Sequence, residues 1–268
     1  MFTTRLVSGI ILVVLAVLIV RAGGSILFAV NGAISMVGLF ELYRVLKIEK
    51  TPLAAIGYLA CAFYYGLIWF DGHRYVTLLA IGTLMLLMSF YVFTFPRYKT
   101  DEITAAFFGV FYVGIMLSYL YQVRQMPDGS YLVWLVFFSS WGCDTCAYCA
   151  GKLLGKHKMT PVLSPKKTIE GAIGGVLGSA VLGCGYAALL GHQMMELNNP
   201  YLACALACGV AAMISQVGDL AASAIKRNHQ VKDYGHLIPG HGGILDRFDS
   251  MIFTAPAIYL VITLLGIV

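Results

Sequence analysis

The chain has 268 residues, of which 59% are hydrophobic and only 12% are charged, with a net charge of +5 and a mean hydropathy of +0.81. Soluble domains carry about 25% charged residues, so this composition excludes an ordinary soluble globular protein and favours one that crosses a membrane several times. The seven cysteines all lie in apolar segments and give no indication of a disulfide framework.

Apolar windows of about 17–23 residues, each long enough to cross a bilayer as a helix, recur along the chain. We predict nine of them, at 4–20, 25–43, 53–70, 75–95, 103–122, 131–151, 171–190, 200–222 and 250–267. Glycine, proline and charged residues between the windows end the helices. The first window resembles a signal peptide, but we expect a retained helix because eight more spans follow. The predicted fold class is an all-α polytopic integral membrane protein.

Nine spans place the two ends of the chain on opposite sides of the membrane. Of the 18 Lys and Arg residues, 15 fall on the side of the N-terminus, and only Arg21, Arg74 and Arg124 fall on the other. This bias predicts a cytoplasmic N-terminus. We divide the chain into an N-terminal region of five spans, 1–130, and a C-terminal catalytic region, 131–268. The C-terminal region holds four spans and two cytoplasmic loops, 152–170 and 223–249.

Small residues are concentrated around the sixth and seventh windows. Cys143, Cys146 and Cys149 recur every three residues, which is compatible with a metal site or with small side chains along a packed helix. Leu153 stands where a bacterial ferredoxin run would place its fourth cysteine, so we favour helix packing. Glycines four residues apart in the seventh window also favour close helix packing, and they are compatible with a homodimer.

Four carboxylates lie inside predicted spans or at their ends. Asp144 is deep in the sixth window, Asp219 is near the cytoplasmic end of the eighth, and Asp246 and Asp249 begin the ninth. Ionisable residues are costly in a membrane and are functional candidates. The alternative is a buried ion pair or a helix-end charge that faces water, and this alternative weighs most for Asp249.

Helical spacing predicts which of these groups share a face. Asp219, Ser223, Lys226 and Arg227 follow the spacing i, i+4, i+7 and i+8 on one helix, and Asp246 begins the next helix. If the helices converge, carboxylates from different helices can share a metal ion. Oxygen ligands without thiolate or imidazole favour Mg²⁺.

Basic residues accompany the acids. Lys166 and Lys167 precede the seventh window, where Ser164-Pro165 is typical of a helix start. A helix N-terminus with two lysines suits an anion, although lysines also simply mark cytoplasmic loops. Acids that hold a cation beside bases that hold anions indicate phosphate chemistry, in which positioning and charge neutralisation replace a dedicated nucleophile. The absence of GxxxxGK[ST] argues against a P-loop kinase or ATPase.

The segment 223–249, SAIKRNHQVKDYGHLIPGHGGILDRFD, resembles the signature of the CDP-diacylglycerol synthase (phosphatidate cytidylyltransferase) family. That pattern runs S-x-x-K-R-x4-K-D, a small residue and a short linker, then H-G-G-x-x-D-R-x-D. It is filled here by Ser223, Lys226, Arg227, Lys232, Asp233, Gly235, Pro239, His241, Gly242, Gly243, Asp246, Arg247 and Asp249. The stretches WGCDTCAYCAGKLLGKHK and LSPKKTIEG also resemble the family, so the likeness covers the second half of the chain.

The resemblance implies an enzyme that makes CDP-diacylglycerol and pyrophosphate from phosphatidate and CTP. It implies Mg²⁺ as cofactor, with a second, monovalent cation such as K⁺ as an option. The partners are then CTP and the membrane lipid phosphatidate, and no nucleic acid is expected. Asp219 and Asp246 are the first candidates for metal ligands, and Asp144 is a third, directly or through water.

The remaining roles rest on the same resemblance. We assign catalysis to Asp144, Asp219, Asp246, Lys226 and Arg227. Substrate binding is assigned to Lys166, Lys167, Ser223, Lys232, His241, Gly242, Gly243 and Arg247, with His241 either binding phosphate or bracing the turn. The two glycines give backbone clearance. Asp249 and Asp233 are structural or orienting residues, and Asp249 is expected to orient Arg247.

The expected place of reaction is the cytoplasmic face of a bacterial plasma (inner) membrane, where cytosolic CTP meets phosphatidate. Such a site needs a lateral opening between helices.

There are three alternative interpretations of the function. A cation-coupled transporter would need a water-filled path past Asp144. A CDP-alcohol phosphotransferase would carry a D-G-x2-A-R…G-x3-D-x3-D pattern, which is absent. A noncatalytic relative would lack part of the signature.

Overall fold

The computed structural model describes residues 2–238, 240 and 242–265, with side chains from residue 7 onward. The elements are α1 (Phe2–Ala22), α2 (Gly24–Val45), α3 (Pro52–Trp69), η1 (His73–Tyr75), α4 (Val76–Phe93), α5 (Thr100–Gly109), η2 (Val110–Ile115), α6 (Met116–Gln125), α7 (Gly129–Phe137), η3 (Phe138–Gly142), α8 (Cys143–Leu154), β1 (Lys158–Thr160), β2 (Ser164–Thr168), α9 (Ile169–Leu190), η4 (Gly191–Gln193), α10 (Pro200–Asn228) and α11 (Leu245–Leu264). Eight helical spans of this described part are long and apolar enough to cross a membrane, and the stretch Val7–Ala22 adds a shorter apolar helix. The predicted polytopic α-helical fold is confirmed.

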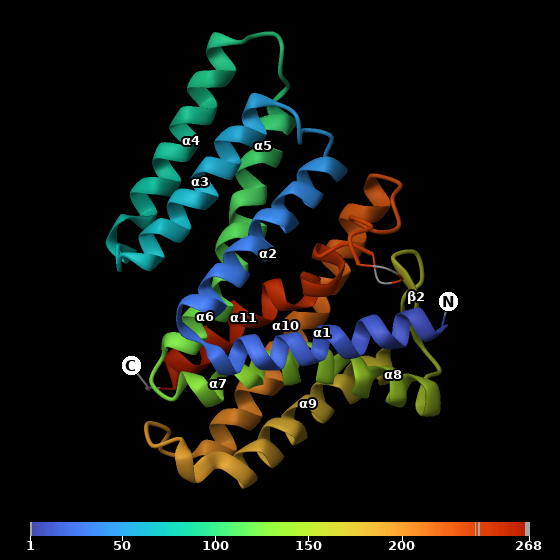
Figure 1. The fold of residues 1–268 in the computed structure, drawn as a ribbon. Coiled ribbons are helices and arrows are strands. Elements are labelled where there is room, and N and C mark those ends of the chain that lie inside the picture. The colour runs from blue at the N-terminus through green and yellow to red at the C-terminus, as the bar shows by residue number, and fades with distance from the viewer. Residues whose placement is uncertain (1, 239, 241, 266–268) are drawn as a thin grey trace.

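The two ends of the bundle differ in what they carry. The start of α1, the β1–β2 hairpin and the connection from α10 to α11 lie at one end, and the end of α11 lies at the other (Figure 1). The nine spans predicted from the sequence would require this separation. It brings the two charged segments, 152–170 and 223–249, to the same end of the molecule.

The expected helix start at Ser164-Pro165 is wrong. Ser164–Thr168 forms strand β2, which pairs antiparallel with β1 so that Lys158 lies opposite Thr168. A proline is tolerated there because each strand of a two-stranded hairpin is an edge strand. Helix α9 begins only at Ile169, where the Thr168 side chain accepts a hydrogen bond from the Gly171 N–H at 3.1 Å.

The glycines of α9 allow close helix packing, as predicted, and the helix that they approach is α8. A Cβ atom on Gly178 would lie only 2.6 Å from the Cβ and Sγ atoms of Cys146, and one on Gly174 would collide with Ala150. Only glycine at these positions lets the two helices approach so closely. Because the glycines face α8 of the same chain, they do not support a homodimer, which stays a prediction.

Two of the three cysteines of α8 take part in this packing. Cys143 lies against Gly175 and Cys146 against Gly178, whereas Cys149 is exposed. Within the described residues, no group of three or more His, Cys, Asp or Glu side chains could hold a metal ion. Helix packing, the interpretation favoured from the sequence, therefore fits Cys143 and Cys146, and the metal alternative finds no support in this part of the chain.

Two of the long spans contain a π-helical segment, which the sequence did not predict. The segment η3 (Phe138–Gly142) joins α7 to α8 directly before Asp144. Such wider turns are rare and occur mostly at functional sites, where they change the direction in which the following side chains point. The hydroxyl of Ser140 in η3 is hydrogen-bonded to that of Ser250, 2.6 Å away, which ties this segment to α11.

Candidate active site

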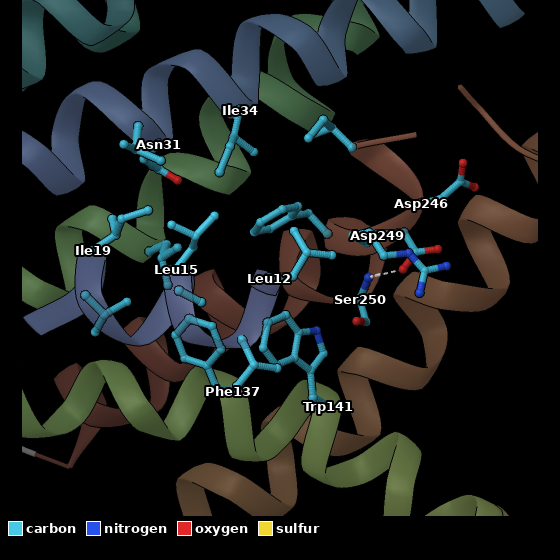
Figure 2. A pocket seen from close by; sticks show the side chains of 18 of the residues that line it. Leu12, Leu15, Ile19, Asn31, Ile34, Phe137, Trp141, Asp246, Asp249 and Ser250 are labelled. Carbon is cyan, nitrogen blue, oxygen red and sulfur yellow. Dashed lines mark hydrogen bonds between the residues drawn. The ribbon is translucent and has the colours of Figure 1, made fainter. Parts of the chain in front are cut away.

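Asp144 lies between two cavities. The first has a volume of about 500 Å³ and is lined by apolar side chains of α1, α2 and α7 together with Asp144, Asp246 and Asp249 (Figure 2). The second has a volume of about 320 Å³ and is lined by Asp144 and three lysines, Lys152, Lys166 and Lys167. The Asp144 carboxylate makes no hydrogen bond or ion pair with another described residue. Asp144 thus lies at the boundary between an apolar and a lysine-lined cavity, with oxygen atoms that no described residue uses.

Asp219 faces the same region from α10. It forms an ion pair with Lys167 across the gap between α10 and β2, and both side chains are partly exposed. Asp219 also lies close enough to Asp144 and Asp249 to interact electrostatically with both carboxylates. The resulting concentration of negative charge favours a bound cation.

Asp246 has the opposite environment, since its side chain is only 2% exposed and every contact is to the protein. Oδ1 accepts a hydrogen bond from Lys226 Nζ at 2.9 Å. Oδ2 accepts from the backbone N–H groups of Tyr234 at 2.8 Å and of Gly243 at 3.0 Å. Asp246 therefore binds α10, the 229–244 connection and the first turn of α11 together.

The predicted pairing of Asp249 with Arg247 is wrong. The cation beside Asp249 is Lys226, whose Nζ lies 3.9 Å from Oδ2, and Oδ1 accepts a hydrogen bond from the Ser250 N–H at 2.8 Å. Arg247 does not pair with Asp246 either. Its Nε is buried without a hydrogen-bond partner, at the wall of the apolar cavity. A buried N–H without a partner costs about 1–3 kcal/mol, so this group is a donor available to an acceptor in the cavity.

Other predicted residues of the 223–249 segment stand at the margin. Arg227 and Lys232 are exposed, whereas Ser223 and Asp233 are partly buried. Within the described part of the chain, these four side chains make no hydrogen bond or ion pair. Their predicted roles in catalysis, substrate binding and orientation stay predictions. Pro239 and His241 lie outside the described residues, as do positions 266–267 of the ninth window.

Gly242 and Gly243 form the tight turn before α11. Gly242 has a φ of +86°, a conformation that side chains other than glycine rarely adopt. Ile238 and Gly242 are joined by a hydrogen bond of 2.9 Å that closes the turn. The prediction that these glycines provide backbone clearance is confirmed by this geometry; their contact with substrate stays a prediction.

Three residues of this site were missed from the sequence. They are Glu41 and Arg44 of α2 and Tyr234 of the connection. Glu41 accepts hydrogen bonds from the N–H groups of Ile244 and Leu245. Arg44 donates to the Tyr234 carbonyl, and the Tyr234 N–H donates to Asp246. Burial raises the pKa of Tyr234, so its phenol remains a neutral donor, to the carbonyl of Ala222 at 3.1 Å. An ionisable residue inside the apolar window 25–43 was a signal for Glu41, by the same rule that selected Asp144.

The acids can be compared with what Mg²⁺ requires. This ion usually binds through one or two carboxylates, water and substrate phosphate. Asp144, which has no protein partner, and Asp219, which is partly exposed, offer such oxygen atoms next to a lysine-lined cavity. These two residues fit the ion in donor chemistry. Asp246 already accepts three hydrogen bonds, and its role as a ligand stays a prediction.

Comparison with known proteins places this site in a family. The profile of the Cytidylyltransferase family matches residues 3–265. Phosphatidate cytidylyltransferase of Bacillus subtilis (strain 168) is 32% identical over 97% of each chain. Proteins of the same name from Staphylococcus saprophyticus and Staphylococcus epidermidis are 31% and 32% identical over 96% of this chain and 98% of theirs. The likeness thus extends over the first half as well as the signature segment, and the chain belongs to the cytidylyltransferase family.

Proposed function

We propose that this protein transfers the cytidylyl group of CTP to phosphatidate and thereby makes CDP-diacylglycerol and pyrophosphate for phospholipid synthesis. The observation that carries the proposal is the position of Asp144, between a basic and an apolar cavity. A reaction between a water-soluble triphosphate and a membrane lipid requires two such neighbouring compartments. The relatives' shared name, phosphatidate cytidylyltransferase, describes a reaction of this kind.

The basic cavity suits the triphosphate of CTP. Lys152 reaches it from the last turn of α8, and Lys166 and Lys167 reach it from β2. Three cations in one cavity can neutralise most of the charge on a triphosphate, and an ammonium group serves a phosphate well as a point charge.

The apolar cavity suits phosphatidate. Leu12, Leu15 and Ile19 of α1 line it together with Phe137 and Trp141, and Figure 2 shows Asp246 and Asp249 at one end of this group of side chains. Acyl chains can lie against the apolar wall while the phosphate reaches the polar end. There, the unpaired Arg247 Nε would receive an acceptor from the lipid phosphate.

In the proposed reaction, a phosphate oxygen of phosphatidate attacks the α-phosphorus of CTP. The bond between the α-phosphorus and the bridging oxygen breaks, and pyrophosphate leaves with that oxygen. The lysines and Arg247 hold the two anionic substrates together at the boundary between the cavities, where Asp144 and Asp219 offer oxygen ligands to a cation. When bound by Asp144 and Asp219, Mg²⁺ would supply charge stabilisation for phosphoryl transfer.

We also propose that the site faces the cytoplasm, in the plasma membrane of a bacterium. The excess of Lys and Arg on the side of the N-terminus supports this orientation, and the hairpin and the 229–244 connection lie at the same end as the start of α1 (Figure 1).

Cysteine labelling tests this orientation. In a cysteine-free background, an impermeant thiol reagent added to intact cells should label Asp71→Cys but not Lys50→Cys. Labelling of Lys50→Cys alone would reverse the orientation.

The reaction itself is tested by turnover of the purified protein in detergent. Phosphatidate and Mg²⁺ are supplied with each of the four ribonucleoside triphosphates, and pyrophosphate release and the lipid product are measured. We expect release that requires both CTP and phosphatidate, and that stops when EDTA removes the metal. No CTP-dependent release would contradict the proposed function.

A further inference from the structure

Glu41 of α2 is a buried acid outside the signature segment and outside every role assigned so far. It is 3% exposed. Its Oε1 accepts a hydrogen bond from the Ile244 N–H at 3.1 Å, and its Oε2 accepts one from the Leu245 N–H at 2.8 Å. A carboxylate from a helix distant in the sequence therefore caps α11, because it accepts hydrogen bonds from two N–H groups at the start of that helix.

This contact matters because of where α11 begins. The first N–H groups of a helix have no acceptor within the helix, and a negative charge is favourable there. Asp246 and Arg247 lie in the first turn, directly after the two N–H groups that Glu41 binds. The position of Glu41 thus sets the position of the residues that line the apolar cavity.

The turn before α11 is shaped around Glu41. A Cβ atom on Gly243 would lie 2.5 Å from both carboxylate oxygens of Glu41, and one on Gly235 would also collide with this carboxylate. Glycine is therefore required at positions 235 and 243 of the signature segment, because the Glu41 carboxylate occupies the space that a side chain would need.

Arg44, one turn after Glu41, holds the other side of the connection. Its Nη2 donates to the Tyr234 carbonyl at 2.6 Å, and the Tyr234 N–H donates to Asp246. Helix α2 therefore contacts the chain before Asp246 at two places, at Tyr234 and at Ile244 and Leu245. Earlier on the same helix, Asn31 and Ile34 line the apolar cavity, so α2 links the wall of the proposed lipid site to the first turn of α11.

We infer that Glu41 is a positioning residue for the reaction: by binding the Ile244 and Leu245 N–H groups, it fixes the first turn of α11 so that Arg247 meets the lipid phosphate at the cavity wall. The inference rests on the proposed function. It predicts that loss of Glu41 lowers kcat, because the reacting groups lose alignment. The KM for CTP should stay unchanged, since Glu41 touches none of the lysines of the basic cavity.

The test compares Glu41→Ala and Glu41→Gln with the wild-type protein, at a temperature below the thermal transition of each. We expect Glu41→Ala to lower kcat about 10- to 100-fold, the range of loss that a misplacement of this kind produces. Glu41→Gln should give a smaller loss, because its amide oxygen can still accept one of the two hydrogen bonds. A matched control is Glu102→Ala, which removes another helix-capping glutamate, at α5 far along the chain, and should leave kcat unchanged.

Hydrogen exchange of the peptide 234–250 supplies a readout that does not depend on turnover. The amides of Ile244 and Leu245 should exchange faster in both Glu41 variants than in Glu102→Ala. Gly243→Ala should lower the free energy of unfolding less in the Glu41→Ala background than in the wild type, because the carboxylate that its Cβ would strike is gone.

The outcomes separate the two proposals. Wild-type turnover with an unchanged kcat in folded Glu41 variants would overturn the inference and leave the proposed function intact. If Glu41→Ala does not fold, Glu41→Gln decides by the same comparison. Absent wild-type turnover would contradict the proposed function, and unchanged exchange at Ile244 and Leu245 would then overturn the role of Glu41 as well.

Discussion

The first turn of α11 and the start of α8 carry carboxylates that line the same apolar cavity in opposite states. Asp246 on α11 is buried, and its oxygens accept three hydrogen bonds from Lys226, Tyr234 and Gly243. Asp144 on α8 has no hydrogen bond or ion pair with a described residue and borders a second, basic cavity. The two acids have the same chemistry, and only their surroundings distinguish them.

The surroundings of Asp246 suit a structural role in the site, and those of Asp144 suit contact with a ligand. A buried charge with full hydrogen bonding stabilises the folded chain only while its partners remain, so removal of one partner is expensive. A carboxylate without a protein partner keeps its charge available for a cation or a substrate, and usually marks function rather than stability. The four predictions below test that division, from the largest expected effect to the smallest.

Asp246→Ala should have the largest effect, because it leaves two backbone N–H groups without an acceptor and leaves the Lys226 ammonium with only Asp249, 3.9 Å away. We expect loss of turnover together with a decrease of about 3–5 kcal/mol in the free energy of unfolding. Thermal unfolding in detergent and pyrophosphate release measure the two effects. In this background Lys226→Ala should add little, and two fully additive losses would show that the pair is not coupled.

Asp144→Asn should lower turnover about 10²- to 10³-fold, the range seen when one electrostatic contact of a transition state is removed. The melting temperature should stay that of the wild type, since no protein hydrogen bond is lost. Asp71→Asn is the matched control, an exposed acid at a φ of 54°, which asparagine tolerates. A stability loss as large as that of Asp246→Ala would remove the distinction between the two acids.

Lys167→Ala should raise the KM for CTP about tenfold, which corresponds to about 1.4 kcal/mol of binding. The residue lines the basic cavity and pairs with Asp219, whereas Lys158 on β1 is exposed and lines neither cavity. Lys158→Ala is therefore the control, with an unchanged KM. Equal KM values in the two variants would place the triphosphate elsewhere.

Ala16→Phe should have the smallest effect, a several-fold increase in the KM for phosphatidate with no change in the KM for CTP. Ala16 lines the apolar cavity from α1, and a phenyl ring would take up part of its 500 Å³. Ile81→Phe, on the exposed surface of α4, adds an aromatic ring outside the cavity and serves as control. Steady-state kinetics in mixed micelles would separate the two substrates, and a change confined to CTP would contradict the assignment of this cavity to the lipid.

Individual residues show that local patterns predicted which groups are functional candidates but did not predict their partners. Asp144 was found because an acid in an apolar window has few explanations, and Glu41 could have been found by the same argument. The partner of Asp249 was predicted wrongly because the signature pattern places Arg247 nearby in the sequence, while the cation beside Asp249, Lys226, comes from another helix. The helix start at Ser164-Pro165 was predicted wrongly because capping signals are local, and the pairing with β1 decided for a strand.

The sequence by itself determined the membrane spans, the gathering of charge at one end, the small residues of α9 that allow close helix packing, and the signature turn. Each of these follows from local composition, spacing or a filled pattern, which do not depend on contacts between distant segments. Only the tertiary structure decided which acid is paired and which is free, where the two cavities meet, and that Glu41 of α2 binds the start of α11. These properties depend on which helices lie together and how they turn, and a π-helical segment such as η3 changes that turn without an evident signal in the chain.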